Sequence, residues 1–430
     1  MRILGVGDAA DLGALYLRLV ADGHDVKISI ADPMCHGTLA GLVERVDNWE
    51  TELPWIRAAG DDGLVVFENV ADGRGERQNQ LRRDGYNVIG SSAYGAKLEH
   101  DRSYAQRILS GLGLSVPRVW DFTSADEACR FVSQRPARYV FKANGPEDPT
   151  YVGADACGED IKSLLTLKPP RSASFILMEA IDGVEMGVGA YFNGERFLLP
   201  ACLDWEHKRF FPGDLGELTG EMGTVVTYAR TNRFFDLTLR KMEPLLRGEG
   251  YCGYINLNTI VNDEGVWPLE FTCRFGYPGF AILDPLQLTA WGDLFRMLIR
   301  GEGERFEKRP GFCVGVVIAT PPFPYTRANV PEPIGFPVVF DPPLTQAEQQ
   351  HLHYGEVGLE AGVLVTSGIY GYPMVVTGTG ETIAAARDAA NALARKVRVP
   401  NARYRLDIGD RLIGGDYAKV EALGLLDPTG

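Results

Sequence analysis

The sequence predicts a mixed α/β fold, α+β in parts, that opens with a parallel β-sheet. Over about the first ninety residues, short apolar runs alternate with helical patterns, as in parallel strands joined by crossover helices. A second observation is a polar-faced hairpin in the middle of the chain, and a third is a strand-then-helix pattern near its end. A chain of 430 residues also exceeds the usual size of one hydrophobic core, so we expect about two to four domains.

The N-terminal elements follow from the spacing of apolar residues. Residues 12–21 have the periodicity of an amphipathic helix. The predicted strands around this helix are 3–6, 26–30, 63–67 and 87–89. Because helices separate them along the chain, we expect these strands to form one parallel sheet.

The central part of the chain alternates again between helical and strand patterns. A helix is predicted from residue 97 to about residue 112, where Gly111 and Gly113 stop it. Strands are predicted at 139–143 and 175–178, and the first of them carries Lys142 among apolar neighbours. An unpaired ammonium there would be costly to desolvate, so we expect either an anionic partner or a strand-edge lysine that reaches water.

The last third of the chain begins with a predicted helix at 286–299, ended by Gly301. Residues 310–343 are rich in proline and are therefore expected to form a domain boundary or a mobile connection. Strands within 362–376 and a helix at 381–397 follow. The residues expected on the inner side of this helix are Ile383, Ala386, Ala390, Leu393 and Val397.

Residues 254–276 hold the most informative pattern in the chain. The turn Asn262-Asp263-Glu264-Gly265 separates two runs of β-branched and aromatic residues, which predicts a β-hairpin. Alternate positions on both runs are polar while their neighbours are apolar. One face of the hairpin is therefore predicted to carry Asn256, Asn258, Glu270 and Thr272.

This polar face suggests a site for a divalent cation. Oxygen ligands with a single carboxylate, held on rigid strands, suit Mg²⁺ (or Mn²⁺), which keeps waters and takes further ligands from a phosphate. The predicted metal ligands are Glu270, Asn258 and Thr272. The alternative is a solvated face of an amphipathic hairpin.

A basic segment and a glycine-rich stretch precede the hairpin. His207, Lys208 and Arg209 are three candidate cations, and residues 213–224 are rich in glycine. Side-chain charge and exposed backbone N–H groups can together hold anionic groups. The alternative is a flexible surface loop with a basic flank.

Several motifs, taken in order, carry a resemblance to a known family. They are Lys142-Ala143-Asn144-Gly145, the pair Glu179 and Glu185, Glu206-His207-Lys208-Arg209, Thr219-Gly220-Glu221-Met222-Gly223, Glu270-Phe271-Thr272-Cys273-Arg274-Phe275-Gly276 and Arg405-Leu406-Asp407-Ile408-Gly409. With these motifs the chain resembles phosphoribosylamine–glycine ligase of the ATP-grasp superfamily over nearly its whole length. The resemblance implies a pre-ATP-grasp domain at 1–96, a split ATP-grasp domain at 97–305 with a smaller subdomain at about 117–182, and a C-terminal domain at 306–430.

The resemblance also implies an activity, its cofactors and the residues that bind nucleotide. Such enzymes use ATP and Mg²⁺ to activate a carboxylate as an acyl phosphate, join it to an amine, and release ADP and phosphate. Lys142 and Arg102 would neutralise the nucleotide phosphates. The hinge from Glu179 to Ile181 would meet adenine, and Glu185 would accept hydrogen bonds from the ribose hydroxyls.

The same resemblance assigns the catalytic end of the site. Arg274 would clamp the acceptor carboxylate or the acyl phosphate, and His207, Lys208 and Arg209 would line the reacting end. Glu270 would hold Mg²⁺, with Thr272 standing where the family has Asn.

Some motifs depart from the family's pattern. The first loop, Gly7-Asp8-Ala9-Ala10-Asp11, lacks the family's Arg and His, and residues 276–279 lack its acidic pair. The loop that would close over the triphosphate, 144–150, is short and acidic, so it would repel phosphates unless it turned away. These differences predict an altered substrate or, as an alternative, a nucleotide-binding relative that has lost ligase activity.

A further alternative comes from the N-terminus. Gly5-Val6-Gly7-Asp8-Ala9-Ala10 follows a predicted strand and Asp32 follows the next one, which fits a dinucleotide-binding fingerprint. This pattern predicts a Rossmann-type NAD-binding oxidoreductase. We rank it lower because the rest of the sequence offers no evident residues for hydride transfer.

Composition limits the partners of the chain. A net charge of -14 argues against nucleic acid, since phosphate binding needs clustered Lys and Arg. The seven cysteines form no C-x-x-C pair, which argues against a zinc site or a disulfide framework and favours reduced thiols in a cytoplasm. No apolar run approaches the length of a membrane span. We therefore expect a cytoplasmic monomer or homodimer whose partners are small molecules, a carboxylate and an amine.

Overall fold

The computed structural model describes residues 1–71, 73–143, 150–170, 174–325 and 334–428. The chain divides into two compact units. Residues 1–105, 185–258 and 270–430 form the first unit, and residues 106–184 and 259–269 form the second. The division into domains at residues 96 and 305 stays a prediction.

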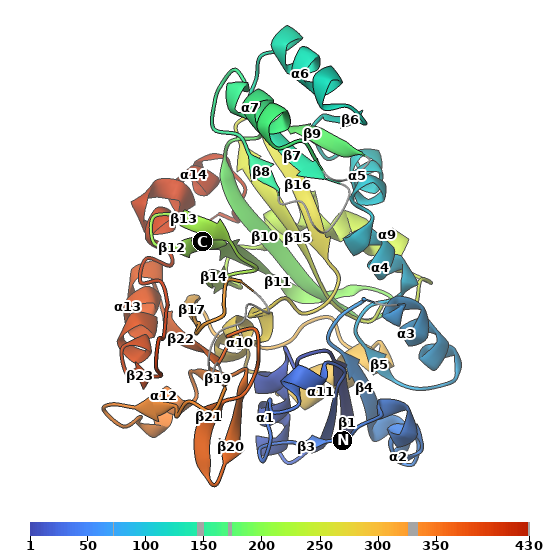
Figure 1. Cartoon of the computed structure of the whole chain (residues 1–430). Helices are drawn as coiled ribbons and strands as arrows, with labels where there is room; N and C mark the ends of the chain where they lie inside the picture. Colours follow the sequence, from blue (N-terminus) through green and yellow to red (C-terminus); the bar gives the residue numbers. More distant parts are fainter. Residues whose placement is uncertain (72, 144–149, 171–173, 326–333, 429–430) are drawn as a thin grey trace. The chain divides into compact units, whose positions relative to one another are not determined.

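The first unit begins with a parallel sheet. Its strands are β1 (Arg2–Gly7), β2 (Asp25–Ile30), β3 (Glu44–Arg45), β4 (Gly63–Phe67) and β5 (Val88–Ile89), in the spatial order β3-β2-β1-β4-β5 (Figure 1). The helices of this region are α1 (Gly13–Ala21), α2 (Leu53–Arg57) and α3 (Arg74–Arg83). β1 pairs in parallel with both β2 and β4 and is buried along most of its length, as expected for a sheet covered on both faces. The predicted parallel sheet is confirmed.

A larger sheet runs through the rest of the first unit. Its strands are β10 (Val184–Phe192), β11 (Phe197–Glu206), β14 (Gly223–Thr227), β15 (Gly253–Asn262), β16 (Gly265–Thr272), β17 (Phe312–Ile318), β19 (Leu352–Tyr354) and β22 (Met374–Gly380). Their spatial order is β16-β15-β10-β11-β14-β17-β22-β19. β17, in the first part of the segment whose proline content indicated a boundary, pairs with β14 and β22.

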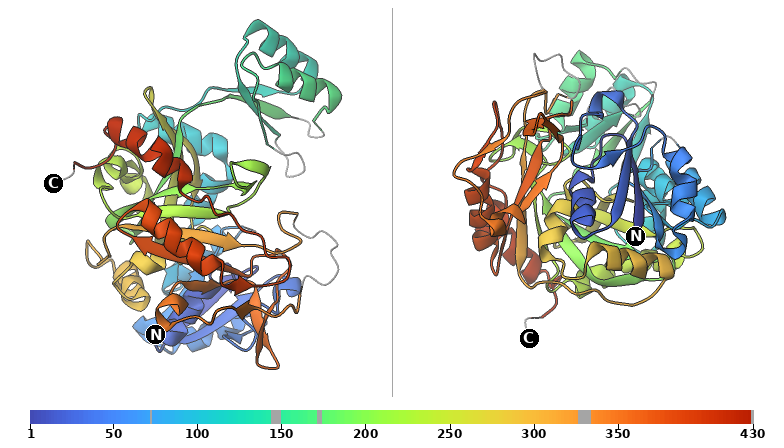
Figure 2. Two further views of the ribbon diagram at one scale, coloured as in Figure 1. Left: turned by 90° about the vertical axis from the view of Figure 1, so that its left-hand side faces the viewer. Right: turned by 90° about the horizontal axis from the view of Figure 1, so that it is seen from below.

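Helices cover this sheet and complete the first unit. α13 (Ile383–Ala394) packs along β17 and β22 (Figure 2). The other helices are α4 (Ala93–His100), α8 (Asn232–Leu237), α9 (Glu243–Leu246), α10 (Gly279–Leu283), α11 (Trp291–Arg300), α12 (Gln346–Gln349) and α14 (Tyr417–Ala422). Three small strand pairs lie outside the sheets: β12 (Arg209–Phe211) with β13 (Leu215–Leu218), β18 (Val339–Phe340) with β23 (Val397–Arg398), and β20 (Val357–Glu360) with β21 (Val363–Thr366).

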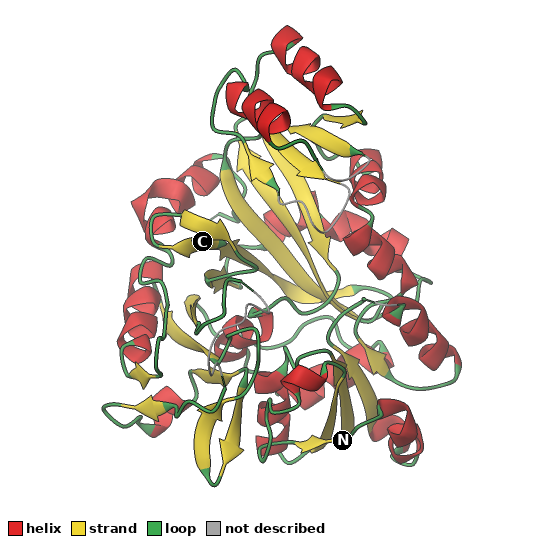
Figure 3. Ribbon diagram, viewed as in Figure 1, coloured by secondary structure: helices red, strands yellow, loops and turns green. Residues whose placement is uncertain are grey.

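The second unit is a small sheet with two helices on it. The strands β6 (Val119–Phe122), β7 (Tyr139–Ala143), β8 (Tyr151–Val152) and β9 (Phe175–Glu179) pair antiparallel in the order β6-β9-β7-β8. The helices α6 (Ala125–Gln134) and α7 (Glu159–Leu167) pack on it (Figure 3). Phe122, Val132, Ile161 and Leu177 are buried between these layers and give the unit its own core.

The predicted hairpin is present as β15 and β16. The Asn262 side chain closes its turn, because its Oδ1 accepts hydrogen bonds from the N–H groups of Glu264 at 3.0 Å and Gly265 at 3.2 Å. An Asn that bonds to backbone two and three residues on is a strong local turn signal. This is why the hairpin could be predicted from the sequence.

Three helix predictions were wrong in their extent. The helix expected over 381–397 is α13, which ends at Ala394, so that Val397 lies on β23. The helix expected over 97–112 is α4 followed by α5 (Arg102–Gly111), because Asp101 leaves the helical conformation at φ -100 and ψ 86 and accepts from the N–H of Tyr104 at 2.8 Å. The helix expected from residue 286 begins at Trp291, after Ala290 with extended backbone at ψ 144. Its predicted end at Gly301 is confirmed. In the described ranges, no helix combines the length and apolar character needed to cross a membrane.

Candidate functional site

The first unit contains a cavity of about 460 Å³. It lies among the turn after β1, the end of β11, the loop before β14, the end of β16 and the loops on either side of β20 and β21. The carboxylates that line it are Asp8, Asp11, Glu206, Glu221, Glu270 and Glu356. The cations and aromatic rings that line it are Lys208, Arg274, Tyr277, Tyr370 and Tyr372. We call this space the acidic cavity.

Four neighbouring strands each bring one polar side chain to the same place. Glu270 lies on β16, Asn258 on β15, Glu185 on β10 and Glu206 on β11, which is the order of these strands across the sheet (Figure 1). Asn258 Nδ2 donates to Glu185 at 3.0 Å and to Glu206 at 3.3 Å. The side chains therefore form a continuous polar row on one face of the sheet.

Lys208 sits over this polar row. Its Nζ lies 3.1 Å from Glu206, 3.2 Å from Glu185 and 3.5 Å from Glu270. Burial alone would lower the pKa of Lys208, but the three carboxylates outweigh burial and raise the pKa above its usual range. One ammonium is thus shared by three carboxylates, which keeps them close together.

Glu270 is also paired with Arg102. Arg102 Nη2 lies 2.9 Å from Glu270 Oε2, and the side chains of Arg102 and Glu270 are 50% and 36% exposed. Two residues predicted for different tasks, phosphate binding and metal binding, are therefore partners in this structure. Since both side chains reach solvent, the pair can separate at low cost when a ligand arrives.

A second polar layer lies beneath the row. Asn256 Nδ2 donates to Asp204 at 2.6 Å. Gly187 on β10 faces Asp204 in the strand register, and a Cβ at this position would collide with the Asp204 carboxylate, so glycine allows the contact. Burial and then the charge of Glu206 raise the pKa of Asp204 to about 7.

Arg274 is held in place by Glu99 of helix α4. Its Nε donates to Glu99 at 3.2 Å and its Nη1 to the carbonyl of Phe275 at 3.1 Å. Glu99 also accepts from the N–H of Cys273 at 2.7 Å. The guanidinium thus has a defined orientation beside the acidic cavity, which suits a residue that positions an anionic group.

The turn after β1 contributes two carboxylates. Asp8 accepts two hydrogen bonds from Arg74, at 2.5 and 2.9 Å. Burial alone would raise the pKa of Asp8, but the contact with Arg74 outweighs burial and lowers it. Beneath the turn, Glu68 accepts from the N–H of Asp11 at 3.0 Å and from the hydroxyl of Tyr16 at 2.8 Å. Burial and then the charge of Asp11 raise the pKa of Glu68 to about 8.

The structure gives His207 and Arg209 surroundings other than the cavity. His207 is buried, its Nε2 accepts from the N–H of Gly409 at 3.1 Å, and burial lowers its pKa to about 4. Arg209 donates to the carbonyl of Gly216 at 2.7 Å within the β12–β13 pair. Neither residue is among those that line the acidic cavity. Their assignment to the reacting end remains a prediction.

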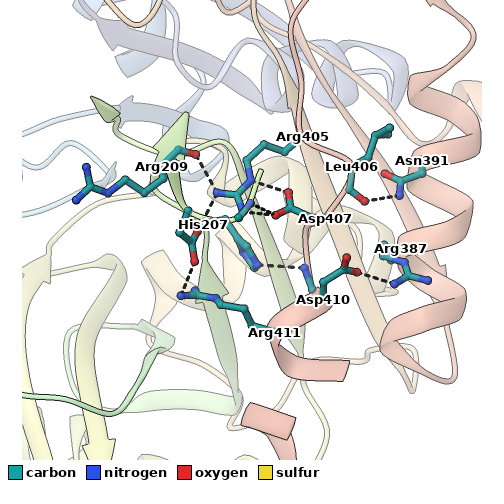
Figure 4. A network of polar contacts seen from close by, with 12 residues as sticks. His207, Arg209, Arg387, Asn391, Arg405, Leu406, Asp407, Asp410 and Arg411 are labelled. Carbon is teal, nitrogen blue, oxygen red and sulfur yellow. Dashed lines mark hydrogen bonds and ion pairs between the residues drawn. The ribbon is translucent and has the colours of Figure 1, made fainter. Parts of the chain in front are cut away.

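A buried arginine anchors this segment to the end of the chain. Arg405, 1% exposed, pairs with Asp407 at 2.7 Å and Asp214 at 3.0 Å. It also donates to the carbonyl of Arg209 at 2.9 Å, and Arg411 reaches Asp214 at 2.9 Å (Figure 4). Arg405 thereby fixes the β12–β13 pair, which lies between Lys208 and Glu221 in the sequence.

The remaining predicted nucleotide-binding residues belong to the second unit. Lys142 lies on β7 opposite Ile176 of β9. Glu179 ends β9 and pairs with Arg118 at 2.8 Å, and Ile181 follows that strand. Residues 144–149, most of the loop predicted to lie near the triphosphate, are outside the described residues. The nucleotide-binding roles of Lys142, Glu179 and Ile181 remain predictions.

Comparison with known proteins shows which domain the central part of the chain contains. Residues 100–280 match the family model described as phosphoribosylglycinamide synthetase, ATP-grasp (A) domain. The chain contains an ATP-grasp domain and resembles phosphoribosylamine–glycine ligase. The matched region includes the polar row, Lys208, Glu221 and Arg274, so this part of the acidic cavity belongs to the ATP-grasp domain.

Whole-length relatives agree with this assignment. The chain is 28% identical to the phosphoribosylamine–glycine ligase of Ralstonia nicotianae, with 96% of this chain and 100% of that protein covered. It is 27% identical to that of Rhizobium meliloti, with 97% and 100% covered. Among solved structures, the phosphoribosylamine–glycine ligase of Thermotoga maritima matches with a TM-score of 0.70 and 24% identity, covering 95% of this chain and 100% of that one. This last match shows the shared fold.

Sequence reasoning missed several residues of the cavity. Glu221 and Glu206 were noticed only as parts of motifs, and Tyr277, Tyr370 and Tyr372 were not assigned to a site. The tyrosines carry no local signal, because Tyr370 and Tyr372 come from a loop far from the ATP-grasp motifs in the sequence. Glu221 did have a local signal, since it stands between Gly220 and Gly223 outside any predicted helix or strand.

Proposed function

We propose that this chain is an ATP-dependent ligase that joins a carboxylate to an amine. A carboxylate oxygen of one substrate attacks the γ-phosphorus of ATP, which forms an acyl phosphate and releases ADP. The amine nitrogen of the other substrate then attacks the acyl carbon, phosphate leaves, and the nitrogen loses a proton to give an amide. The protein's task in such a reaction is to position the groups and to stabilise charge.

One arrangement supports this proposal most directly. Glu270, Thr272, Lys208 and Arg274 line one cavity, and all four lie in the region that matches the ATP-grasp model. The oxygen ligands and the two cations are thus next to a space large enough for small substrates.

We assign roles to the residues of this cavity. Lys208 neutralises negative charge that develops on the reacting groups near Glu206 and Glu270. Arg274 holds the acceptor carboxylate or the acyl phosphate. In the same proposal, Arg102, Lys142, Glu179, Ile181 and Glu185 bind ATP. Arg102 would exchange its contact with Glu270 for a phosphate oxygen, which its exposure permits.

The residues present are suited to Mg²⁺. In the described part of the chain, no group of three or more His, Cys, Asp or Glu side chains is arranged to hold a metal ion by itself. Mg²⁺ needs only one or two carboxylates when waters and phosphates complete its shell, and Glu270 with the Thr272 hydroxyl fits that requirement. When bound, the ion (or Mn²⁺) would neutralise the phosphates. Asn258 uses its amide nitrogen on Glu185 and Glu206, so we assign it to positioning these carboxylates.

The proposal is tested by ligand-dependent melting followed by an assay of ADP release. Saturating ATP with Mg²⁺ should raise the melting temperature, because a ligand at about 100 times its Kd adds about 2.7 kcal/mol to the stability of the native state. ATP with a chelator and NAD alone serve as controls. An equal shift with NAD would support the oxidoreductase alternative.

ADP release separates a ligase from a nucleotide-binding relative. The full chain, ATP and Mg²⁺ are incubated with a panel of carboxylates combined with a panel of amines. Release that needs both an acid and an amine supports the ligase. A melting shift with ATP and Mg²⁺ but no release with any pair would instead support a relative that has lost ligase activity.

We also propose a cytoplasmic location and small-molecule partners. All seven cysteines are free thiols, five of them buried, which is typical of a reducing compartment. Light scattering distinguishes the two expected states, a monomer and a homodimer.

A further inference from the structure

The acidic cavity has more carboxyl groups than cations among the residues that line it. Six of the described residues that line it are carboxylates and two, Lys208 and Arg274, are cations, while Arg74 and Arg102 pair with Asp8 and Glu270 from outside the lining. Lys208 is shared by three glutamates, and Arg274 is held by Glu99. Arg274 suits an anion on its own side of the cavity, whereas beside Glu221 an added cation would be attracted.

Glu221 is the carboxylate that most clearly lacks a partner. Its side chain lines the acidic cavity, the residue is only 6% exposed, and its Oε1 accepts no hydrogen bond from the described residues. A buried carboxyl oxygen without a donor is costly, so native proteins rarely leave one unless a ligand or an ion supplies the donor. Glu221 thus indicates a ligand with N–H donors.

Asp11 lies on another wall of the same cavity. Its backbone N–H donates to Glu68, while its carboxylate makes no hydrogen bond to the described residues and feels the charge of Arg274. By contrast, Glu356 is already satisfied, since it accepts from the N–H groups of Tyr370 at 3.0 Å, Gly371 at 2.6 Å and Tyr372 at 2.9 Å. Asp11 and Glu221 are therefore the two carboxylates best placed to receive a new donor.

Aromatic rings complete the surroundings. Tyr277 and Tyr372 pack with their ring centroids 4.8 Å apart, and Tyr370 lines the cavity with them. Faces of tyrosine rings attract ammonium groups as well as alkyl chains. A ligand with an alkyl chain and a positive end would find both kinds of contact here.

We propose that the amine substrate is a small diamine without a phosphate group, whose second ammonium is bound by Glu221 and Asp11. One nitrogen reacts as the neutral amine, and the other stays protonated and anchors the molecule. This inference rests on the proposed ligase function and specifies its substrate class. A phosphorylated amine would instead bring a dianion against Glu221 and Asp11.

Titration calorimetry on the full chain tests the inference. The probes are linear diamines with about two to five methylene groups, monoamines of equal length, and ribose phosphate, each added with saturating ADP and Mg²⁺. At least one diamine should bind about tenfold more tightly than its monoamine, since only it carries the second charge. Ribose phosphate should bind more weakly than that diamine.

Substitutions locate the anchoring group. Glu221→Gln keeps the shape of the side chain and should weaken the best diamine about thirtyfold, because one partner of a buried charge pair is lost. Asp11→Asn should weaken it less, since Asp11 is exposed. Glu302→Gln removes the same charge from an exposed position outside the cavity and should change the affinity less than about twofold.

The outcomes separate this inference from the proposed function. If ADP with Mg²⁺ binds but diamines and monoamines bind equally, or if ribose phosphate binds best, the inference is wrong and the ligase proposal stands. The inference is also wrong if Glu221 binds Mg²⁺ rather than an amine. In that case the heat of Mg²⁺ binding, measured without amine, would be lost in Glu221→Gln. If ATP with Mg²⁺ does not bind, the proposed function itself fails. A melting curve of each variant shows that it is folded, and Glu221→Ala provides a second, smaller side chain.

Discussion

The ammonium of Lys208 lies 3.5 Å from the carboxylate of Glu270, the residue we assign to Mg²⁺. The same ammonium contacts Glu206 and Glu185 from two further strands. A tethered cation thus holds the carboxylates of three strands in place before any ligand binds, which is a form of preorganisation. Stability and nucleotide binding are therefore expected to depend on the same group.

Lys208→Met should destabilise the protein in a pH-dependent way. Without the ammonium, the carboxylates repel one another, and we expect a loss of about 2 kcal/mol at neutral pH, since the cluster is only partly buried. Protonation of the carboxylates at low pH removes the repulsion, so the difference from wild type should shrink. Urea unfolding of both proteins across pH measures it. An equal difference at low and neutral pH would contradict this account of Lys208.

Glu270→Gln should weaken Mg²⁺-dependent nucleotide binding far more than Thr272→Ala. The amide removes the negative charge that attracts a divalent ion, whereas the hydroxyl supplies only a neutral dipole. Calorimetric titration of ATP with and without Mg²⁺ gives the metal-dependent part for each variant. If both substitutions had the same effect, Glu270 would not be the principal ligand.

Phosphoribosylamine and glycine are expected to be poor substrates. The first loop lacks the family's Arg and His, and a site whose partner groups are missing discriminates strongly against the original substrate. ADP release with this pair is measured against the panel of other acids and amines. Turnover on the order of 1 per second or more with the original pair would show that other residues have replaced the missing ones.

Arg405→Met should destabilise the protein by about 3 kcal/mol, because it leaves Asp407 and Asp214 without their buried partner. Arg411→Met is a matched control, since Arg411 also contacts Asp214 but is 48% exposed. The control should cost less than about 1 kcal/mol. Urea unfolding measures the free energy of unfolding of both variants. Equal losses would mean that the burial of Arg405 does not increase its contribution to stability.

His353 should make stability fall as the pH falls from 6.5 to about 4. Its imidazole is buried near the hydroxyl of Thr377 at 3.1 Å, and burial lowers its pKa from 6.5 to about 4. Between these pH values the imidazole is protonated in the unfolded chain but not in the native state. Protonation therefore favours unfolding by up to about 3 kcal/mol, and this effect is absent above pH 6.5.

The prediction for His353 is measured as a difference between proteins. Urea unfolding of wild type and His353→Gln from neutral pH to about pH 4 should show a smaller loss of stability in the variant. His100→Gln, at an exposed position, should keep the slope of the wild type. A variant His353→Gln with the wild-type slope would show that the imidazole is not the group responsible.

Local patterns predicted the elements more reliably than their ends. The hairpin and the first parallel sheet were predicted because strand alternation and the Asn262 turn are signals within a few residues. The break at Asp101 was missed, since a single carboxylate can leave the helix to bond the next turn, and the apolar periodicity continues past it. The start of α11 was placed too early for a similar reason, because apolar residues at 286 and 288 extend its pattern.

The amino-acid sequence alone predicted most strands of the first sheet, the polar face of the hairpin and the resemblance to ATP-grasp ligases, but not strands β10, β11, β14 and β17. Only the tertiary structure decided that β10 and β11 lie beside that hairpin, so that Glu185, Glu206 and Glu270 share one ammonium. The order of strands in a sheet depends on packing between segments that are far apart in the sequence. Such long-range pairing produces no repeating pattern of apolar residues from which it could be predicted. The same reason explains why Glu221, Asp11 and the tyrosines of a distant loop could be recognised as one acidic cavity only once the chain was folded.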